Sequence, residues 1–101
     1  MRYKKRYFLI ELNGEFDDPV DKIIFNTVNK IEPFLAIRSN LRVINDGIKK
    51  YKNKTYFIIA VNNDFKYRVI FALSLISKFY KANLLTIKNS GNIKKIKSFK
   101  F

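Results

Sequence analysis

The sequence predicts an α+β fold, in which two long helices pack on one four-stranded antiparallel sheet. Four segments rich in β-branched and aromatic residues are typical of strands. Two further segments place apolar residues at the 3.6-residue spacing of a helix. The order is strand, helix, strand, strand, helix, strand, with turn residues between the segments.

The first strand is predicted at residues 7–12, with Phe8, Ile10 and Leu12 on one face and Tyr7, Leu9 and Glu11 on the other. Asn13-Gly14 ends it. We expect Asp18 to cap the first helix, which Pro33 then kinks or ends. The apolar face of this helix comprises Val20, Ile24, Thr27 or Val28, Ile31 and Leu35.

Two strands are predicted at residues 41–51 and 55–62. They can be joined at Asp46-Gly47, which suits a two-residue hairpin, or at residues 51–54. The first turn leaves a short unpaired piece after Ile48. We therefore favour the second turn, with Gly47 at a bulge.

A second helix follows Asp64, its expected cap, and residues 83–89 form the fourth strand. One side of this helix is lined by Phe65, Val69, Ala72, Leu73, Ile76 and Phe79. After Ser90-Gly91-Asn92 we expect a short, basic C-terminal helix. The order of elements is that of a ferredoxin-like (RRM-like) β-α-β-β-α-β sandwich.

Residues 56–61 are apolar on both faces of their strand, so both faces of the sheet should be covered. Leu9, Ile44, Ile58 and Leu84 are expected on the face away from the two long helices. The C-terminal helix is predicted to cover that face through Ile93 and Ile96.

The 101 residues fit a single domain, residues 1–101, with 48% hydrophobic and 16% aromatic residues. Lys and Arg number 21 against eight Asp and Glu, a formal charge of +13 that favours a nucleic-acid partner. The absence of Cys and His excludes disulfides, thiolate nucleophiles, the common zinc sites and Ser-His pairs. The apolar stretch after the basic N-terminus is too short for a signal peptide or membrane span, so we expect a cytoplasmic protein without membrane contact.

Two basic segments are candidate RNA-binding elements. The N-terminal arm alternates cations with aromatics, as contacts that follow an RNA backbone often need, although a solvated terminus would read the same way. The turn before the closing helix can aim backbone N–H groups at a phosphate, although an ordinary capped helix has this sequence too. The predicted RNA-binding residues are Arg2, Lys4, Lys5, Arg6, Lys88, Ser90, Gly91, Asn92, Lys94 and Lys95.

Carboxylates cluster at Glu11, Glu15, Asp17, Asp18 and Asp21, and such groups can hold magnesium for phosphodiester cleavage. Helix capping and the helix dipole already account for the last three. We therefore predict neither a metal site nor a catalytic residue on this chain.

Apolar and aromatic residues outside the predicted core allow two readings each. Tyr7 and Tyr56 could form a base-stacking platform, but the third strand lacks the glycine-aromatic pattern of such platforms, so packing is favoured. Ile70 and Phe71 fall outside the apolar stripe of the second helix. They are either the edge of a broad core or anchors for a protein partner.

Three stretches give the chain a resemblance to the Pop-five family, a protein subunit of archaeal and eukaryotic ribonuclease P. They are Arg6-Tyr7-Phe8-Leu9-Ile10-Glu11-Leu12, then Asp64-Phe65 with Ala72-Leu73 and Ile76, and Ser90-Gly91-Asn92-Ile93-Lys94-Lys95. Their order and spacing match, and the closing element is the most specific. Relatives tend to place arginines where this chain has Ala60 and Asn63.

The resemblance implies a ferredoxin-like subunit of a ribonucleoprotein that removes 5′ leaders from precursor tRNA. The RNA carries out this endonucleolytic cleavage with magnesium, and the protein itself holds no cofactor. The implied partners are ribonuclease P RNA, precursor tRNA and a TIM-barrel protein subunit, with a homodimer inside a heterotetramer as one arrangement. Two other functions stay open: a ribosomal or other structural RNA-binding protein, and a magnesium-dependent nuclease.

Overall fold

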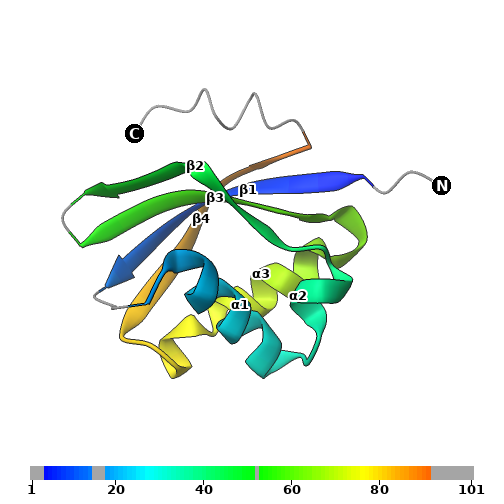
Figure 1. The fold of residues 1–101 in the computed structure, drawn as a ribbon, viewed down its shortest axis with the longest axis horizontal. Helices are drawn as coiled ribbons and strands as arrows, with labels where there is room; N and C mark the ends of the chain where they lie inside the picture. Colours follow the sequence, from blue (N-terminus) through cyan, green and yellow to red (C-terminus); the bar gives the residue numbers. More distant parts are fainter. Residues whose placement is uncertain (1–3, 15–17, 52, 92–101) are drawn as a thin grey trace.

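The computed structural model describes residues 4–14, 18–51 and 53–91. It contains one sheet with helices on one of its faces (Figure 1). The elements are β1 (Lys5–Gly14), α1 (Val20–Ile31), α2 (Leu35–Arg38), β2 (Arg42–Tyr51), β3 (Lys54–Asn62), the 3₁₀ turn η1 (Asn63–Phe65), α3 (Lys66–Ser74), the 3₁₀ turn η2 (Ile76–Lys78) and β4 (Ala82–Ser90). The predicted α+β class with one four-stranded antiparallel sheet is confirmed. The predicted C-terminal helix lies outside the described residues.

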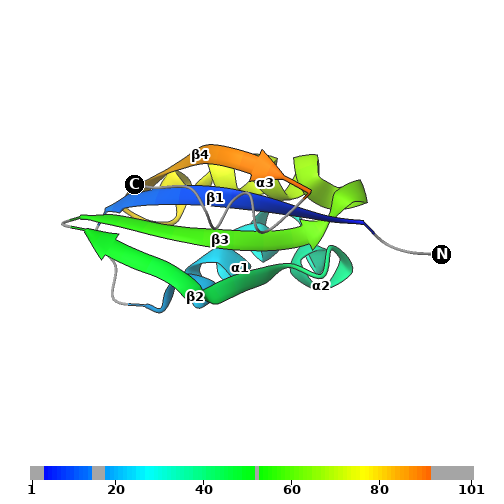
Figure 2. The same cartoon turned by 90° about the horizontal axis from the view of Figure 1, so that it is seen from above.

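The four strands are arranged in the order β2-β3-β1-β4, and each neighbouring pair is antiparallel (Figure 2). In this register Lys5 at the start of β1 is opposite Asn62 at the end of β3. Tyr7 is opposite Ser90 at the end of β4. The start of β1 and the ends of β3 and β4 therefore meet at one end of the sheet, which we call the basic end.

The main core lies between the sheet and the helices. The predicted apolar stripes are largely confirmed, with these side chains buried: Phe8, Ile10 and Leu12 of β1; Val20, Ile24 and Val28 of α1; Val69, Ala72 and Leu73 of α3; and Ile76 of η2. Phe79 is an exception, because α3 ends at Ser74 and the helical spacing does not continue to that residue. Phe79 remains partly exposed, with the Lys30 ammonium 4.9 Å from its ring centroid.

The other face of the sheet, the open face, carries a smaller buried cluster. Leu9 and Ile58 are buried there, with Ile44 packed against them, as predicted. The prediction for Leu84 is wrong. Leu9 pairs with Lys88 but Ile10 pairs with Thr86, so one residue of β4 is skipped. The side chains of β4 that precede the skipped residue therefore lie on the opposite face from the one predicted.

This bulge puts Leu84 against the helix-side core, while its neighbour Leu85 is exposed beside Glu11. The predicted covering residues Ile93 and Ile96 lie outside the described part of the chain.

Both predicted helix caps are wrong. Pro19 occupies the cap position of α1, where no side chain makes a capping hydrogen bond, and Asp18 lies 3.9 Å from Lys22 in an exposed ion pair. Asp64 lies inside η1 instead of directly before α3. A 3₁₀ turn leads into α3. Its i→i+3 hydrogen bonds satisfy some of the backbone N–H groups that a capping side chain would otherwise bind.

The turn favoured between the two middle strands is confirmed, since Tyr51 pairs with Lys54. The predicted bulge is also confirmed: the register of β2 against β3 shifts between Ile44 and Lys49, a stretch that contains Gly47. β2 is therefore a long edge strand with an irregular middle.

Positive φ values at Gly14 and Phe34 shape two of the loops. Gly14 has φ 143°, and a Cβ there would collide with the Lys81 carbonyl oxygen and the Ala82 backbone, so this turn needs glycine. Phe34 has φ 68°, an unusual value for a bulky side chain, and α2 begins directly after it. The Asn29 carboxamide accepts a hydrogen bond from the Ala36 N–H at 3.2 Å and ties α2 to α1.

Candidate nucleic-acid interface

A cationic hollow of about 470 Å³ lies at the basic end of the sheet. We call it the basic cleft. Its described lining is Lys4, Lys5, Arg6, Asn63, Lys66 and Gly91. These residues come from the start of β1, from η1 and the first residue of α3, and from the residue after β4, so three distant segments build one site.

Hydrogen bonds fix Lys4 and Arg6 in the cleft. The Asn63 N–H donates to the Lys4 carbonyl oxygen at 2.7 Å, which extends the pairing of β1 with β3 by one step. Arg6 Nη2 donates to Asn89 Oδ1 at 2.6 Å. The Arg6 guanidinium also lies beside Gly91, where a Cβ would be 3.6 Å from Nη1. Residues 4–6 are therefore positioned by the fold next to the end of β4.

The charges of the cleft have one sign. None of its described lining residues is acidic, and within the described chain Lys4, Lys5 and Lys66 make no ion pair. Lys66 lies over the Tyr67 ring at 5.0 Å, a contact that leaves its charge uncompensated. The first turn of α3 adds the positive end of a helix dipole. The arrangement suits a phosphate backbone.

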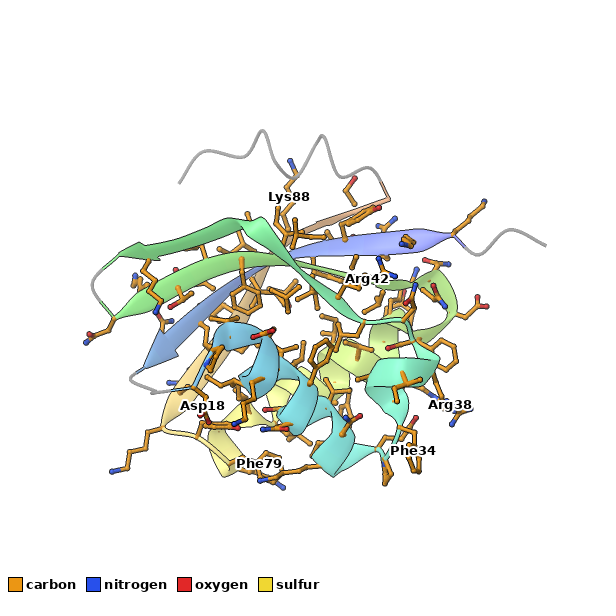
Figure 3. The ribbon with its side chains drawn as sticks, viewed as in Figure 1. Asp18, Phe34, Arg38, Arg42, Phe79 and Lys88 are labelled. Carbon is orange, nitrogen blue, oxygen red and sulfur yellow. The ribbon has the colours of Figure 1, made fainter. Side chains whose placement is uncertain are left out.

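The structure brings together four of the predicted RNA-binding residues, Lys4, Lys5, Arg6 and Gly91. Lys88 is not among them: its side chain is exposed on the open face, opposite Leu9, and points away from the helices (Figure 3). Ser90 is half-buried opposite Tyr7 and does not line the cleft. The others, Arg2, Asn92, Lys94 and Lys95, lie outside the described residues.

Sequence reasoning missed Lys66 and Asn63 as parts of this site. The helical pattern places Lys66 on the polar side of its helix and gives it no link to the N-terminal arm. The available signal is positional, because the residues that end β3 and begin α3 must lie at the end of the sheet where β1 starts.

A second hollow, of about 750 Å³, adjoins the basic cleft. We call it the sheet-end hollow. It is lined by Lys5, Ile37, Arg38, Asn40, Asn62 and Phe65. Arg38 lies over the Phe65 ring at 5.8 Å, and its label in Figure 3 marks it on the side of the molecule opposite Asp18. Arg68 lies 6.0 Å from the same ring and 3.7 Å from Glu32.

The acid of β1 is held in a local network on the open face. Glu11 accepts hydrogen bonds from Asn13 Nδ2 at 2.9 Å and from the Tyr56 hydroxyl at 2.7 Å, with Lys54 at 4.0 Å. The hydrogen bond from Asn13, then that from Tyr56, lowers the pKa of Glu11 against the opposing effect of burial. The same bond to Glu11 raises the pKa of the Tyr56 phenol.

These contacts decide the reading of the two tyrosines. Tyr56 is half-buried and bonded to Glu11, and Tyr7 packs against the Leu9 cluster. These contacts agree with packing, the favoured interpretation. In the described ranges no three acidic side chains converge as metal ligands, and Glu15 and Asp17 lie outside those ranges.

The two candidate partner anchors on α3 separate. Ile70 is half-buried and packs against the main core, which fits the first of its two interpretations, the edge of a broad core. Phe71 is 63% exposed, and Tyr67, one helical turn earlier, is 79% exposed. Their exposure leaves Phe71, with Tyr67, as the candidate contact on this helix.

No protein-family model matches the chain, and no curated protein sequence matches it. None of the helices in the described part of the chain has the length and apolar character needed to cross a bilayer.

Proposed function

We propose that this protein binds RNA through the basic cleft and serves as a protein subunit of ribonuclease P. The observation that carries the proposal is the convergence of Lys4, Lys5, Arg6 and Lys66 on one hollow without an acid in its described lining. Each cation that neutralises a phosphate releases a counterion, which favours binding strongly at low salt. The contacts are to the backbone, so they position RNA more than they read its sequence.

In this proposal the RNA performs the cleavage. The protein supplies positive charge where RNA segments approach one another, which lowers their repulsion and helps to organise a magnesium-dependent site made by the RNA. The chain itself contributes no catalytic residue and holds no cofactor. The substrate is precursor tRNA, and the product has lost its 5′ leader.

Parts of the three stretches that resemble the Pop-five family lie in the cleft or next to it, and this supports the proposed family. Arg6 of the first stretch lies beside Gly91 of the third. Asp64-Phe65 of the second stretch follows Asn63, whose N–H binds the Lys4 carbonyl. The sheet order β2-β3-β1-β4 supports a ferredoxin-like arrangement, because two interleaved β-α-β units produce it.

The proposal includes protein partners. Phe71 and Tyr67 present aromatic surface on α3, the kind of residue that anchors protein interfaces. We assign this surface to the TIM-barrel subunit, with a homodimer inside a heterotetramer as one assembly. The complex would act in the cytoplasm.

Recovery of the protein from its host, followed by sequencing of the bound RNA, tests the proposal. Ribonuclease P RNA and precursor tRNA are the expected species. Ribosomal RNA alone would overturn the ribonuclease P assignment in favour of a structural RNA-binding protein.

A cleavage assay separates this function from a nuclease. Purified protein with magnesium should leave precursor tRNA intact, and the cognate RNA with the barrel partner should restore cleavage. Cleavage by the protein alone, abolished by Asp17→Ala or Asp18→Ala, would show a nuclease instead.

A further inference from the structure

We propose that the sheet-end hollow binds an unpaired base of a single-stranded RNA segment whose phosphates lie in the neighbouring basic cleft. This inference rests on the proposed RNA binding and adds the form of RNA that the site takes. It assigns a role to Ile37, Arg38, Asn40, Asn62 and Phe65, which line the hollow.

The two hollows are neighbours at the end of the sheet. Lys5 lines both of them. Asn62 and Phe65 line the hollow, while their sequence neighbours Asn63 and Lys66 line the cleft. A strand that places phosphates between Lys4, Lys5 and Lys66 therefore has the hollow within reach of its next base.

The lining of the hollow has the chemistry of a base site. Ile37 and Phe65 supply apolar surface, and the planar Arg38 guanidinium can stack on a base while its charge faces a phosphate. Asn40 and Asn62 are half-buried, and neither side-chain amide makes a hydrogen bond to another described residue. Each amide offers a donor and an acceptor to the edge of a base.

The exposure of α2 agrees with this assignment. Ile37 is 78% exposed, although it borders a concave surface that could bury it. The short helix is held between two residues with positive φ, Phe34 at 68° and Asn40 at 53°. Only Phe34 is strained, because Asn readily adopts this conformation just past a helix end. Strained backbone persists where the surrounding structure holds it, and it is common at ligand sites. Ser39 adds such a tie, because its carbonyl accepts the Asn62 N–H at 2.8 Å.

A single strand fits this pair of sites better than a duplex. The bases of a duplex are paired and stacked inside it, so its phosphates could enter the cleft but no base could enter the hollow. Binding should therefore depend on free bases as well as on charge.

The test compares three RNA probes of about ten nucleotides: oligouridine, the same strand without its bases, and a duplex. Wild-type protein should bind oligouridine at least about fivefold more tightly than the strand without bases, the lower end of what one stacked base provides. Arg38→Lys keeps the charge but removes the planar group, and Ile37→Ser removes exposed apolar surface. Both should weaken oligouridine binding about fivefold and leave the other two probes unchanged.

Arg42→Lys is the matched control, since Arg42 is an exposed arginine on β2 that does not line either hollow. It should bind all three probes as wild type does. Equal wild-type affinity for oligouridine and the strand without bases would overturn the base site. The base site would also be overturned if Ile37→Ser weakened a protein complex but left RNA binding unchanged.

A failed base site stays distinguishable from a failed RNA-binding function. A weaker salt dependence of binding in Lys4→Ala with Lys66→Ala would keep the cleft as the phosphate site even if the hollow plays no part.

Discussion

The charged side chains at the two ends of the sheet have different contacts. At the end where β1 finishes and α1 begins, Glu11 is engaged by Asn13, Tyr56 and Lys54, and Asp18 is paired with Lys22. At the basic end, Lys4, Lys5 and Lys66 gather around one hollow without an ion pair to a described residue. Figure 1 shows these two ends at opposite sides of the sheet.

This difference separates structure from function within one sheet. Paired charges lower their own electrostatic energy, and they leave little field for a ligand. Like charges that the fold holds together without partners repel one another, and a polyanion relieves that repulsion. The basic end is therefore the better candidate for a polyanion site, because its cations converge on one hollow.

The largest effect on stability is expected from Gly14→Ala, at the end of the sheet where β1 finishes. The new Cβ would meet the Lys81 carbonyl and the Ala82 backbone at a φ of 143°. Backbone strain and overpacking together should cost roughly 2 to 6 kcal/mol of unfolding free energy. Urea denaturation measures this, and a decrease below about 1 kcal/mol would show that the turn can relax.

Phe71→Asp is expected to act on assembly. Because Phe71 is 63% exposed, the isolated protein should keep its unfolding free energy within about 0.5 kcal/mol. Binding of the proposed barrel partner should weaken tenfold or more, which titration calorimetry would detect. Ile70→Asp is the contrast, because Ile70 packs on the core and its replacement should destabilise the fold. A Phe71→Asp variant that unfolds would place Phe71 in the core as well.

Low pH should decrease the unfolding free energy through protonation of Glu11. Its pKa is lowered from 4.5 in the folded chain, so its contribution to stability is present above about pH 4.5 and is lost as the pH falls through the folded-state pKa. Unfolding free energy measured between pH 6 and pH 2.5 should fall less steeply in Glu11→Gln. Tyr56→Phe, which removes one hydrogen bond to the carboxylate, should give an intermediate profile. Identical profiles for Glu11→Gln and wild type would rule out this role.

The smallest effect is expected from Gly91→Ala at the basic end. Its added Cβ would lie 3.6 Å from Arg6 Nη1, an ordinary contact with a side chain. Unfolding free energy should change by less than about 0.5 kcal/mol, in contrast to Gly14→Ala. A large decrease in stability would show that Gly91 is as constrained as Gly14.

The order and class of the elements were predictable because hydrophobic period and turn residues are local. The hairpin at residues 51–54 followed from the same reasoning and is confirmed. The face occupied by Leu84 was not predictable, since the bulge in β4 arises only when β4 is paired with β1. The caps failed because Pro19 and a 3₁₀ turn start the helices instead of aspartates.

The candidate site was predictable only in part. Lys4, Lys5 and Arg6 form a visible basic run, but their proximity to Lys66 and Gly91 depends on the order of the strands. Arg38 was missed for the same reason, as it reaches the site through the strained turn at Phe34. Charge in a sequence indicates the kind of ligand, and the topology decides which charges act together.

The most direct test compares RNA binding by two double variants at several salt concentrations. Each variant lacks two lysines from one end of the sheet. Lys4→Ala with Lys66→Ala should make the plot of log affinity against log salt shallower by about 0.7 for each single-strand phosphate that the variant no longer neutralises. Lys22→Ala with Lys54→Ala lowers the net charge equally and should leave the slope unchanged. Equal slopes in the two double variants would contradict the assignment of RNA binding to the basic end.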